Sequence, residues 1–211
     1  MKTEKDLSQI SPDDAIKILK QGNKRFLEEE FEEKNFKKDI DATSSGQHPF
    51  AAILSCIDSR VGCELIFDQG IGDIFNVRLA GNVINEDALA SLEFAGLVTG
   101  SKLILVLGHT CCGAVMGACD RFEEGHLKSL VSKIYPVINN VEPRFGERAS
   151  SNLNFVNEVV RLNVKHVITE IRSKSNILNK LEENGELIIT GAMYNVSNGA
   201  VTFLDPNNDE T

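Results

Sequence analysis

The chain lacks tryptophan, long apolar runs and any excess of positive charge. No apolar segment approaches the roughly 20 residues that a membrane-spanning helix needs. The first nine residues lack the apolar region of a secretory signal. We therefore expect a cytoplasmic protein, although a trimmed organelle precursor would have the same pattern. The net charge of -9 argues against nucleic-acid binding, because such a surface offers little to neutralise phosphates.

The cysteine content also gives no sign of a disulfide-bonded framework. Five cysteines are an odd number, and a disulfide framework is more typical of a shorter, secreted chain. In a reducing compartment, cysteines near a histidine more often indicate metal binding or catalysis. The length of 211 residues suits one domain or at most two small ones. Hydrophobic residues at 42% and charged residues at 25% are ordinary globular usage, so the chain can form a sizeable core.

Short apolar runs alternate with helical patterns. Buried strands are predicted at 50–55, 73–77 and 102–107, and a final hairpin at 186–193 and 200–204. Helices are predicted at 11–26, 85–98, 113–121, 153–171 and 175–185, with an extended polar connection at 28–47. This order predicts an α/β fold with a central, mostly parallel sheet, an antiparallel edge strand, helices on both faces and an N-terminal helical arm. We expect one domain over 1–211, with the arm and connection at 1–47 and the α/β core at 48–211.

The most unusual residues follow two of the predicted strands. In a parallel sheet, ligands bind beyond the carboxyl ends of the strands. The sequence C-I-D-S-R follows the first strand and H-T-C-C-G follows the third. Two thiolates and one imidazole from Cys56, His109 and Cys112 are a normal zinc set, and three protein ligands leave a fourth position for water.

The remaining cysteines and histidines have simpler interpretations. Cys111 is the one rival ligand, since it could replace Cys112. Gly113 would let the backbone pass close to the metal. We interpret the others as core, spare or surface side chains: Cys63, Cys119, His48, His126 and His166.

Asp58 and Arg60 favour a catalytic site over a structural one. A structural zinc site has no need of a carboxylate and a guanidinium beside it. Asp58 can accept the hydrogen of a zinc-bound hydroxide and thereby aim its lone pair at an electrophile. Arg60 can keep Asp58 ionised and oriented through paired hydrogen bonds.

C-x-D-S-R followed some fifty residues later by H-x-x-C-G resembles the β-class carbonic anhydrases. The resemblance extends to R-L-A-G-N at 78–82, S-L-E-F-A at 91–95 and the helix at 11–26, so it covers most of the chain. It implies one zinc ion per subunit on Cys56, His109 and Cys112, and a catalytic pair of Asp58 and Arg60. The implied reaction is the reversible hydration of carbon dioxide to bicarbonate and a proton, in which zinc-bound hydroxide attacks carbon dioxide.

The resemblance also implies substrate contacts. Gln47 matches a glutamine of the plant-like branch, which donates a hydrogen bond to substrate in the neighbouring subunit's site. Phe75 and Ala80 fall where that branch lines its apolar pocket, and Gly113 would border the same site. Phe94 stands where a tyrosine is common, so a hydroxyl contact is lost. Ile53 replaces the tryptophan of the regulated branch, which implies the open, always-accessible form.

The family forms homodimers, often paired into tetramers, whose first helices wrap the partner subunit. We expect the same here, with carbon dioxide or bicarbonate as the small-molecule partner and neither nucleic acid nor membrane as a partner. Two alternatives stay open. One is a related zinc hydrolase acting on carbon disulfide or carbonyl sulfide. The other is a non-catalytic zinc or thiol module, which the adjacent pair Cys111 and Cys112 invites.

Overall fold

A five-stranded sheet forms the centre of the protein in the computed structural model, which describes residues 4–204. Its strands are β1 Ala51–Ser55, β2 Ile74–Arg78, β3 Leu103–His109, β4 Ile188–Tyr194 and β5 Val201–Phe203. Their spatial order is β2-β1-β3-β4-β5, and only β5 pairs in the antiparallel direction. The predicted fold class is therefore confirmed. Residues 1–3 and 205–211 of the expected single domain lie outside the described part.

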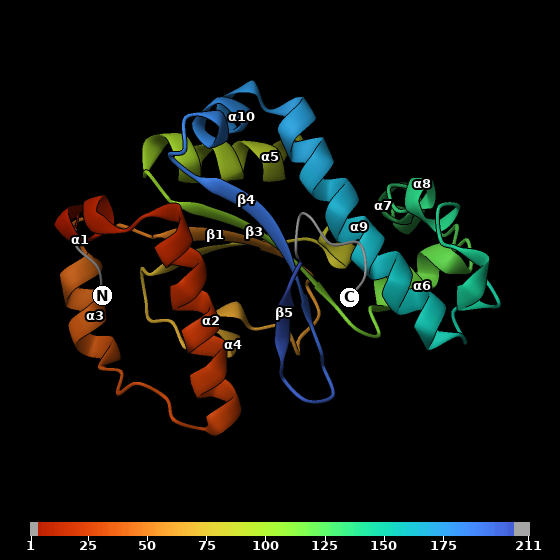
Figure 1. Cartoon of the computed structure of the whole chain (residues 1–211), viewed down its shortest axis with the longest axis horizontal. Coiled ribbons are helices and arrows are strands. Elements are labelled where there is room, and N and C mark those ends of the chain that lie inside the picture. The colour runs from red at the N-terminus through yellow and green to blue at the C-terminus, as the bar shows by residue number, and fades with distance from the viewer. Residues whose placement is uncertain (1–3, 205–211) are drawn as a thin grey trace.

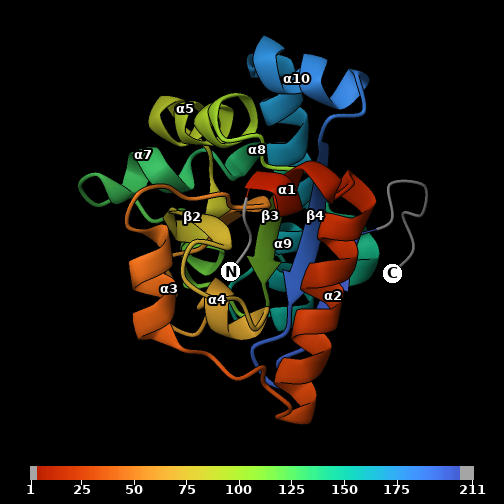
Figure 2. The ribbon, with the colours of Figure 1, turned by 90° about the vertical axis from the view of Figure 1, so that its left-hand side faces the viewer.

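Helices cover both faces of this sheet (Figure 1). The α-helices are α1 Glu4–Gln9, α2 Pro12–Glu28, α3 Phe36–Thr43, α4 Cys63–Ile66, α5 Glu86–Glu93, α6 Gly113–Cys119, α7 Leu127–Val131, α8 Tyr135–Ile138, α9 Leu153–Lys174 and α10 Asn176–Glu183. Short 3-10 turns lie at Ala80–Asn82 and Pro143–Phe145, and a π-helical segment at Phe94–Val98. Figures 1 and 2 show α2 and α4 on one face of the sheet and α5 and α10 on the other. Across residues 4–204, none of the helices combines the length and apolar character that a bilayer crossing requires.

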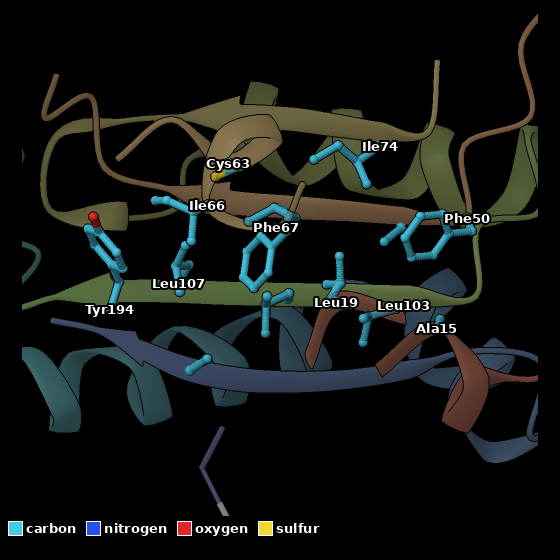
Figure 3. Close-up of a cluster of buried hydrophobic side chains, with 14 of the residues drawn as sticks. Ala15, Leu19, Phe50, Cys63, Ile66, Phe67, Ile74, Leu103, Leu107 and Tyr194 are labelled. Carbon is cyan, nitrogen blue, oxygen red and sulfur yellow. The ribbon is translucent and has the colours of Figure 1, made fainter. Parts of the chain in front are cut away.

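The first five residues of β3 are all apolar because both faces of this strand are covered. All seven of its residues are buried. Leu103, Leu105 and Leu107 join the cluster that includes α2 and α4, whereas Ile104 and Val106 join the cluster under α9 and α10. A strand covered on both faces needs apolar side chains at every position. Figure 3 shows the first of these clusters, with Leu103 and Leu107 beside side chains from α2 and α4.

Three predicted helices begin where their capping residues indicated. The Ser11 side chain accepts a hydrogen bond from the Asp14 amide, and Asp14 bonds back to complete a capping box. Asn85 caps α5 through the Ala88 amide, and Ser175 caps α10. The predicted helix at 85–98 changes character at Phe94, where the π-helical segment begins.

The polar stretch at 28–47 is not wholly extended, which corrects the prediction. It contains α3, whose first turn is capped when the Asn35 side chain accepts from the Lys38 amide. Among the residues of α3, none is buried. Its two large apolar side chains, Phe36 and Ile40, lie one turn apart but are exposed, and two positions are too short a pattern to predict a helix from sequence.

The N-terminal helix α2 packs on the chain's own sheet. Ala15 and Leu19 are fully buried in the same cluster as β3. The Asn23 amide donates to the carbonyls of Ile66 (3.2 Å) and Gly199 (2.9 Å). Ala15 and Leu19 therefore need no partner subunit to cover them, whereas the expectation that the first helices wrap a partner subunit stays a prediction.

Candidate metal centre

Two neighbouring strand ends bring the three predicted ligands together. Cys56 directly follows β1, and His109 is the last residue of β3, which pairs with β1 in parallel. Cys112 lies immediately before α6. The ligand atoms of these three buried residues all lie within 4.8 Å of one another, and the two Sγ atoms are 3.9 Å apart. Such a cluster can hold one metal ion.

The imidazole of His109 is oriented for a ligand at Nε2. Its Nδ1 lies 3.0 Å from the carbonyl oxygen of Thr110. A carbonyl can only accept, so Nδ1 carries the hydrogen and Nε2 presents its lone pair. The side chain is fully buried, yet Nε2 has no hydrogen-bond partner anywhere in residues 4–204. A buried lone pair without a donor, next to two sulfur atoms, fits a metal ion.

The Sγ atoms of Cys56 and Cys112 are in contact, and this contact shifts the pKa values of the two thiols in opposite directions. The Cys112 thiol donates to Cys56, which lowers the pKa of Cys56 and raises that of Cys112. Burial opposes the effect on Cys56, while the Gly81 amide, 3.3 Å from Cys56 Sγ, supports it. Gly81 has φ +68°, a conformation that favours glycine. Binding of a dication would require both thiols to be deprotonated.

Asp58 and Arg60 form a bidentate ion pair beside this cluster. Arg60 Nε donates to Asp58 Oδ1 at 2.9 Å and Nη2 donates to Oδ2 at 2.7 Å. These side-chain hydrogen bonds hold the pKa of Asp58 well below its usual range. Asp58 Oδ2 lies 3.9 Å from His109 Nε2, so an ionised acceptor lies at the edge of the cluster without belonging to it.

Arg78 braces the loop that carries Cys56 and Asp58, a role that sequence reasoning missed. Its Nε donates to the Cys56 carbonyl at 3.0 Å, and its Nη2 donates to the Asp58 carbonyl at 2.7 Å. The only signal was its place in R-L-A-G-N, which supported the resemblance but carried no role.

The predicted substrate residues are spread more widely. Phe75, on β2, packs edge-on against Phe94 with ring centroids 6.4 Å apart, and both line a groove of about 650 Å³. Ala80 begins the 3-10 turn beside Cys56. A Cβ at Gly113 would meet no atom within 4 Å, so open space borders this residue. Gln47 is exposed before β1, at the opposite end of that strand from Cys56.

The residues that were given simpler interpretations stay outside the cluster. Within the described part of the chain, Cys111 is half-buried and is not a member of the metal-binding group. Cys63 is buried, donates weakly to Ser55 Oγ at 3.5 Å, and burial raises the pKa of its thiol to about 11. The three other histidines, His48, His126 and His166, do not join the cluster either.

Comparison with known proteins identifies the family. A family model described as carbonic anhydrase matches residues 51–201. The chain belongs to the carbonic anhydrase family. It is 35% identical to carbonic anhydrase 2 of Mycobacterium tuberculosis over 92% of this chain and 94% of that protein. It is 33% identical to a carbonic anhydrase of Mycolicibacterium smegmatis, over 90% and 92% of the two chains.

Solved structures assign it to the β class. The β-carbonic anhydrase CafA of Aspergillus fumigatus is 26% identical and superposes with a TM-score of 0.69 over 80% of this chain and 81% of that one. The fold also matches the β-carbonic anhydrase CcaA, with a TM-score of 0.73 at 23% identity over 90% and 95% of the chains. The protein is therefore an enzyme, a β-class carbonic anhydrase, and its family supports carbon dioxide hydration as the reaction.

Proposed function

We propose that this carbonic anhydrase hydrates carbon dioxide reversibly with a zinc ion held by Cys56, His109 and Cys112, and that Asp58 and Arg60 form its catalytic pair. The observation that carries the proposal is the buried, unpartnered Nε2 of His109 in residues 4–204, within 4.8 Å of two cysteine sulfurs. An ionised carboxylate stands 3.9 Å from that nitrogen. This combination suits chemistry on a small electrophile.

The donor set favours zinc over other divalent ions. Two soft thiolates and one imidazole suit zinc, whereas calcium and magnesium prefer oxygen ligands. Three protein ligands leave one position of a tetrahedral ion open, as in catalytic zinc sites. When bound, zinc would supply a nucleophile by lowering the pKa of a water molecule.

The protein's own groups would orient this nucleophile. Asp58 can accept a hydrogen bond from the attacking oxygen, because an ionised carboxylate carries no hydrogen and acts purely as an acceptor. Arg60 donates one hydrogen bond to each oxygen of the Asp58 carboxylate, and this pair of bonds fixes the plane of the carboxylate. The apolar rings of Phe75 and Phe94 border the groove beside β2, which suits an uncharged linear substrate. A proton must then leave to solvent or buffer.

Metal analysis and kinetics test this proposal together. The purified protein is expected to contain about one zinc ion per chain and to hydrate carbon dioxide in a stopped-flow assay. Removing zinc with a chelator should abolish the activity, and returning zinc should restore it. A metal-replete protein that is inactive at alkaline pH would refute the proposal.

Two other results would favour other functions. Hydrolysis of carbon disulfide or carbonyl sulfide, with negligible hydration of carbon dioxide, would indicate a related hydrolase. A zinc ion enclosed entirely by protein sulfur and nitrogen, with no exchangeable water, would indicate a non-catalytic module.

We also propose that the active form is at least a homodimer. Gln47 cannot reach the Cys56 site of its own chain, because β1 alone separates them by roughly 17 Å. Beside the edge strand β2, Phe94 is 51% exposed and lines the groove with Phe75. A second copy would cover these rings and could bring its Gln47 to the site. Among relatives of similar fold, two β-carbonic anhydrases of Sordaria macrospora are tetrameric.

Sedimentation velocity tests this assembly. The protein is expected to sediment at two or more times the mass of one chain, and Phe94→Glu is expected to shift it toward a monomer with lower activity. Leu127→Glu is a matched control, because Leu127 is also 51% exposed but lies on α7. A fully active wild-type monomer at micromolar concentration would contradict the dimer.

A further inference from the structure

A single peptide group links the metal ligand His109 to the helix α9. The carbonyl of Thr110 accepts from His109 Nδ1 at 3.0 Å. The amide at the other end of the same peptide unit belongs to Cys111, and it donates to Asn157 Oδ1 at 3.0 Å. Asn157 lies in the second turn of α9, 46 residues further along the chain. One side chain on a long helix therefore holds the peptide that orients the imidazole.

The backbone at this point needs such an anchor. Cys111 has φ +55°, a left-handed conformation that is uncommon for residues other than glycine. Such conformations persist when the surrounding contacts determine them. The contact from Asn157 is well formed, whereas Arg60 Nη2 reaches the Cys111 carbonyl only at 3.5 Å. The turn between His109 and Cys112 thus depends on a hydrogen bond from outside the loop.

The helix can serve as a fixed support. Val156 and Val160, on either side of Asn157, are fully buried in the cluster next to the metal centre. The opposite end of the loop is held separately, since the Thr110 amide donates to the Tyr194 carbonyl at 2.9 Å. These contacts leave the peptide between Thr110 and Cys111 little freedom to rotate.

We propose that Asn157 is a positioning residue for His109, acting through the peptide between Thr110 and Cys111. When an amide N–H donates a hydrogen bond, the carbonyl of the same peptide becomes a stronger acceptor. A stronger acceptor at Thr110 fixes the ring of His109 and makes Nε2 more basic, as groups that contact metal ligands do. The inference rests on the zinc site proposed above, but it assigns a role to a residue outside that site.

Zinc affinity, measured by competition with a chromophoric chelator, tests the role of Asn157. Asn157→Leu keeps the approximate size of the side chain and removes the hydrogen-bond acceptor. We expect this variant to bind zinc about tenfold more weakly than the wild type, which is the low end of the effect of removing a group that contacts a metal ligand. Asn157→Asp keeps an acceptor oxygen and is expected to bind zinc within about threefold of the wild type, or more tightly. Activity of the zinc-loaded enzyme is a secondary readout.

Asn154→Leu is the matched control. Asn154 lies one turn earlier on α9 and lines the same cavity of about 430 Å³ as Asn157, but it is exposed. It is expected to leave zinc affinity unchanged. Unfolding of the metal-free proteins shows whether each variant is folded, and Asn157→Ala replaces Asn157→Leu in the comparison if the leucine variant does not fold.

The results separate this inference from the zinc site itself. If the wild type binds no zinc, the proposed metal centre fails. If the wild type binds zinc and the variant without an acceptor binds it equally well, only the role of Asn157 is overturned. Equal weakening in the aspartate variant, or in the Asn154 control, also overturns it, because the acceptor oxygen would then not be the cause.

Discussion

Cys112→Ser is expected to abolish zinc binding and carbon dioxide hydration, while Cys111→Ser preserves both. The serine hydroxyl is neutral near pH 7, so the exchange removes an anionic ligand from a buried dication. Cys112 is fully buried with its Sγ 3.9 Å from that of Cys56, whereas Cys111 lies outside this group. We expect zinc content to fall from about one ion to below about 0.1 per chain and activity to fall at least about 1,000-fold.

Cys111→Ser makes this a sharp comparison, because the two substitutions differ by one position in the same turn. Metal content is measured by elemental analysis under reducing conditions, so that oxidation of neighbouring thiols does not mimic the loss of a ligand. If zinc is lost from the Cys111 variant and retained in the Cys112 variant, the ligand assignment is reversed. If neither variant loses zinc, the metal is not bound by this turn.

The cluster that these variants probe could be located from sequence for a physical reason. Neighbouring parallel strands end at the same edge of a sheet, so residues that follow them are close in space even when they are far apart in the chain. Cys56 and His109 meet in this way across 53 positions. The pairing of Asp58 with Arg60 was also accessible, because the two residues are neighbours in the same loop.

The supports of the site could not be located from sequence. Arg78 reaches back over 22 positions, and Asn157 reaches over 46, to bond backbone groups that have no sequence signature. Nothing in the chain's pattern distinguishes Asn157 from Asn154, one turn away on the same helix. The packing of α2 on its own sheet was missed for a similar reason, since an amphipathic helix shows that it needs an apolar surface but not which surface covers it.

Asp58→Asn is expected to slow catalysis strongly with little effect on the metal. The asparagine amide has almost the same shape as the carboxylate, but it is neutral and its nitrogen donates hydrogen bonds where the carboxylate has an accepting oxygen. It cannot accept from the attacking oxygen while also satisfying both nitrogens of Arg60, which now donate to Oδ1 and Oδ2. We expect kcat/KM to fall about 100- to 1,000-fold, within the range for loss of a positioned acid or base.

Zinc affinity distinguishes a catalytic role for Asp58 from a structural one. Asp58 is not a member of the metal-binding cluster, so zinc should bind Asp58→Asn within about threefold of the wild type. Asp87→Asn, on the exposed first turn of α5, removes the same charge far from the pair with Arg60 and should change neither quantity. If Asp58→Asn weakens zinc binding as much as it slows catalysis, Asp58 supports the fold of the loop and does not orient the nucleophile. A loss of turnover with unchanged zinc affinity would mean that the carboxylate, paired with Arg60, acts in catalysis and not in metal binding.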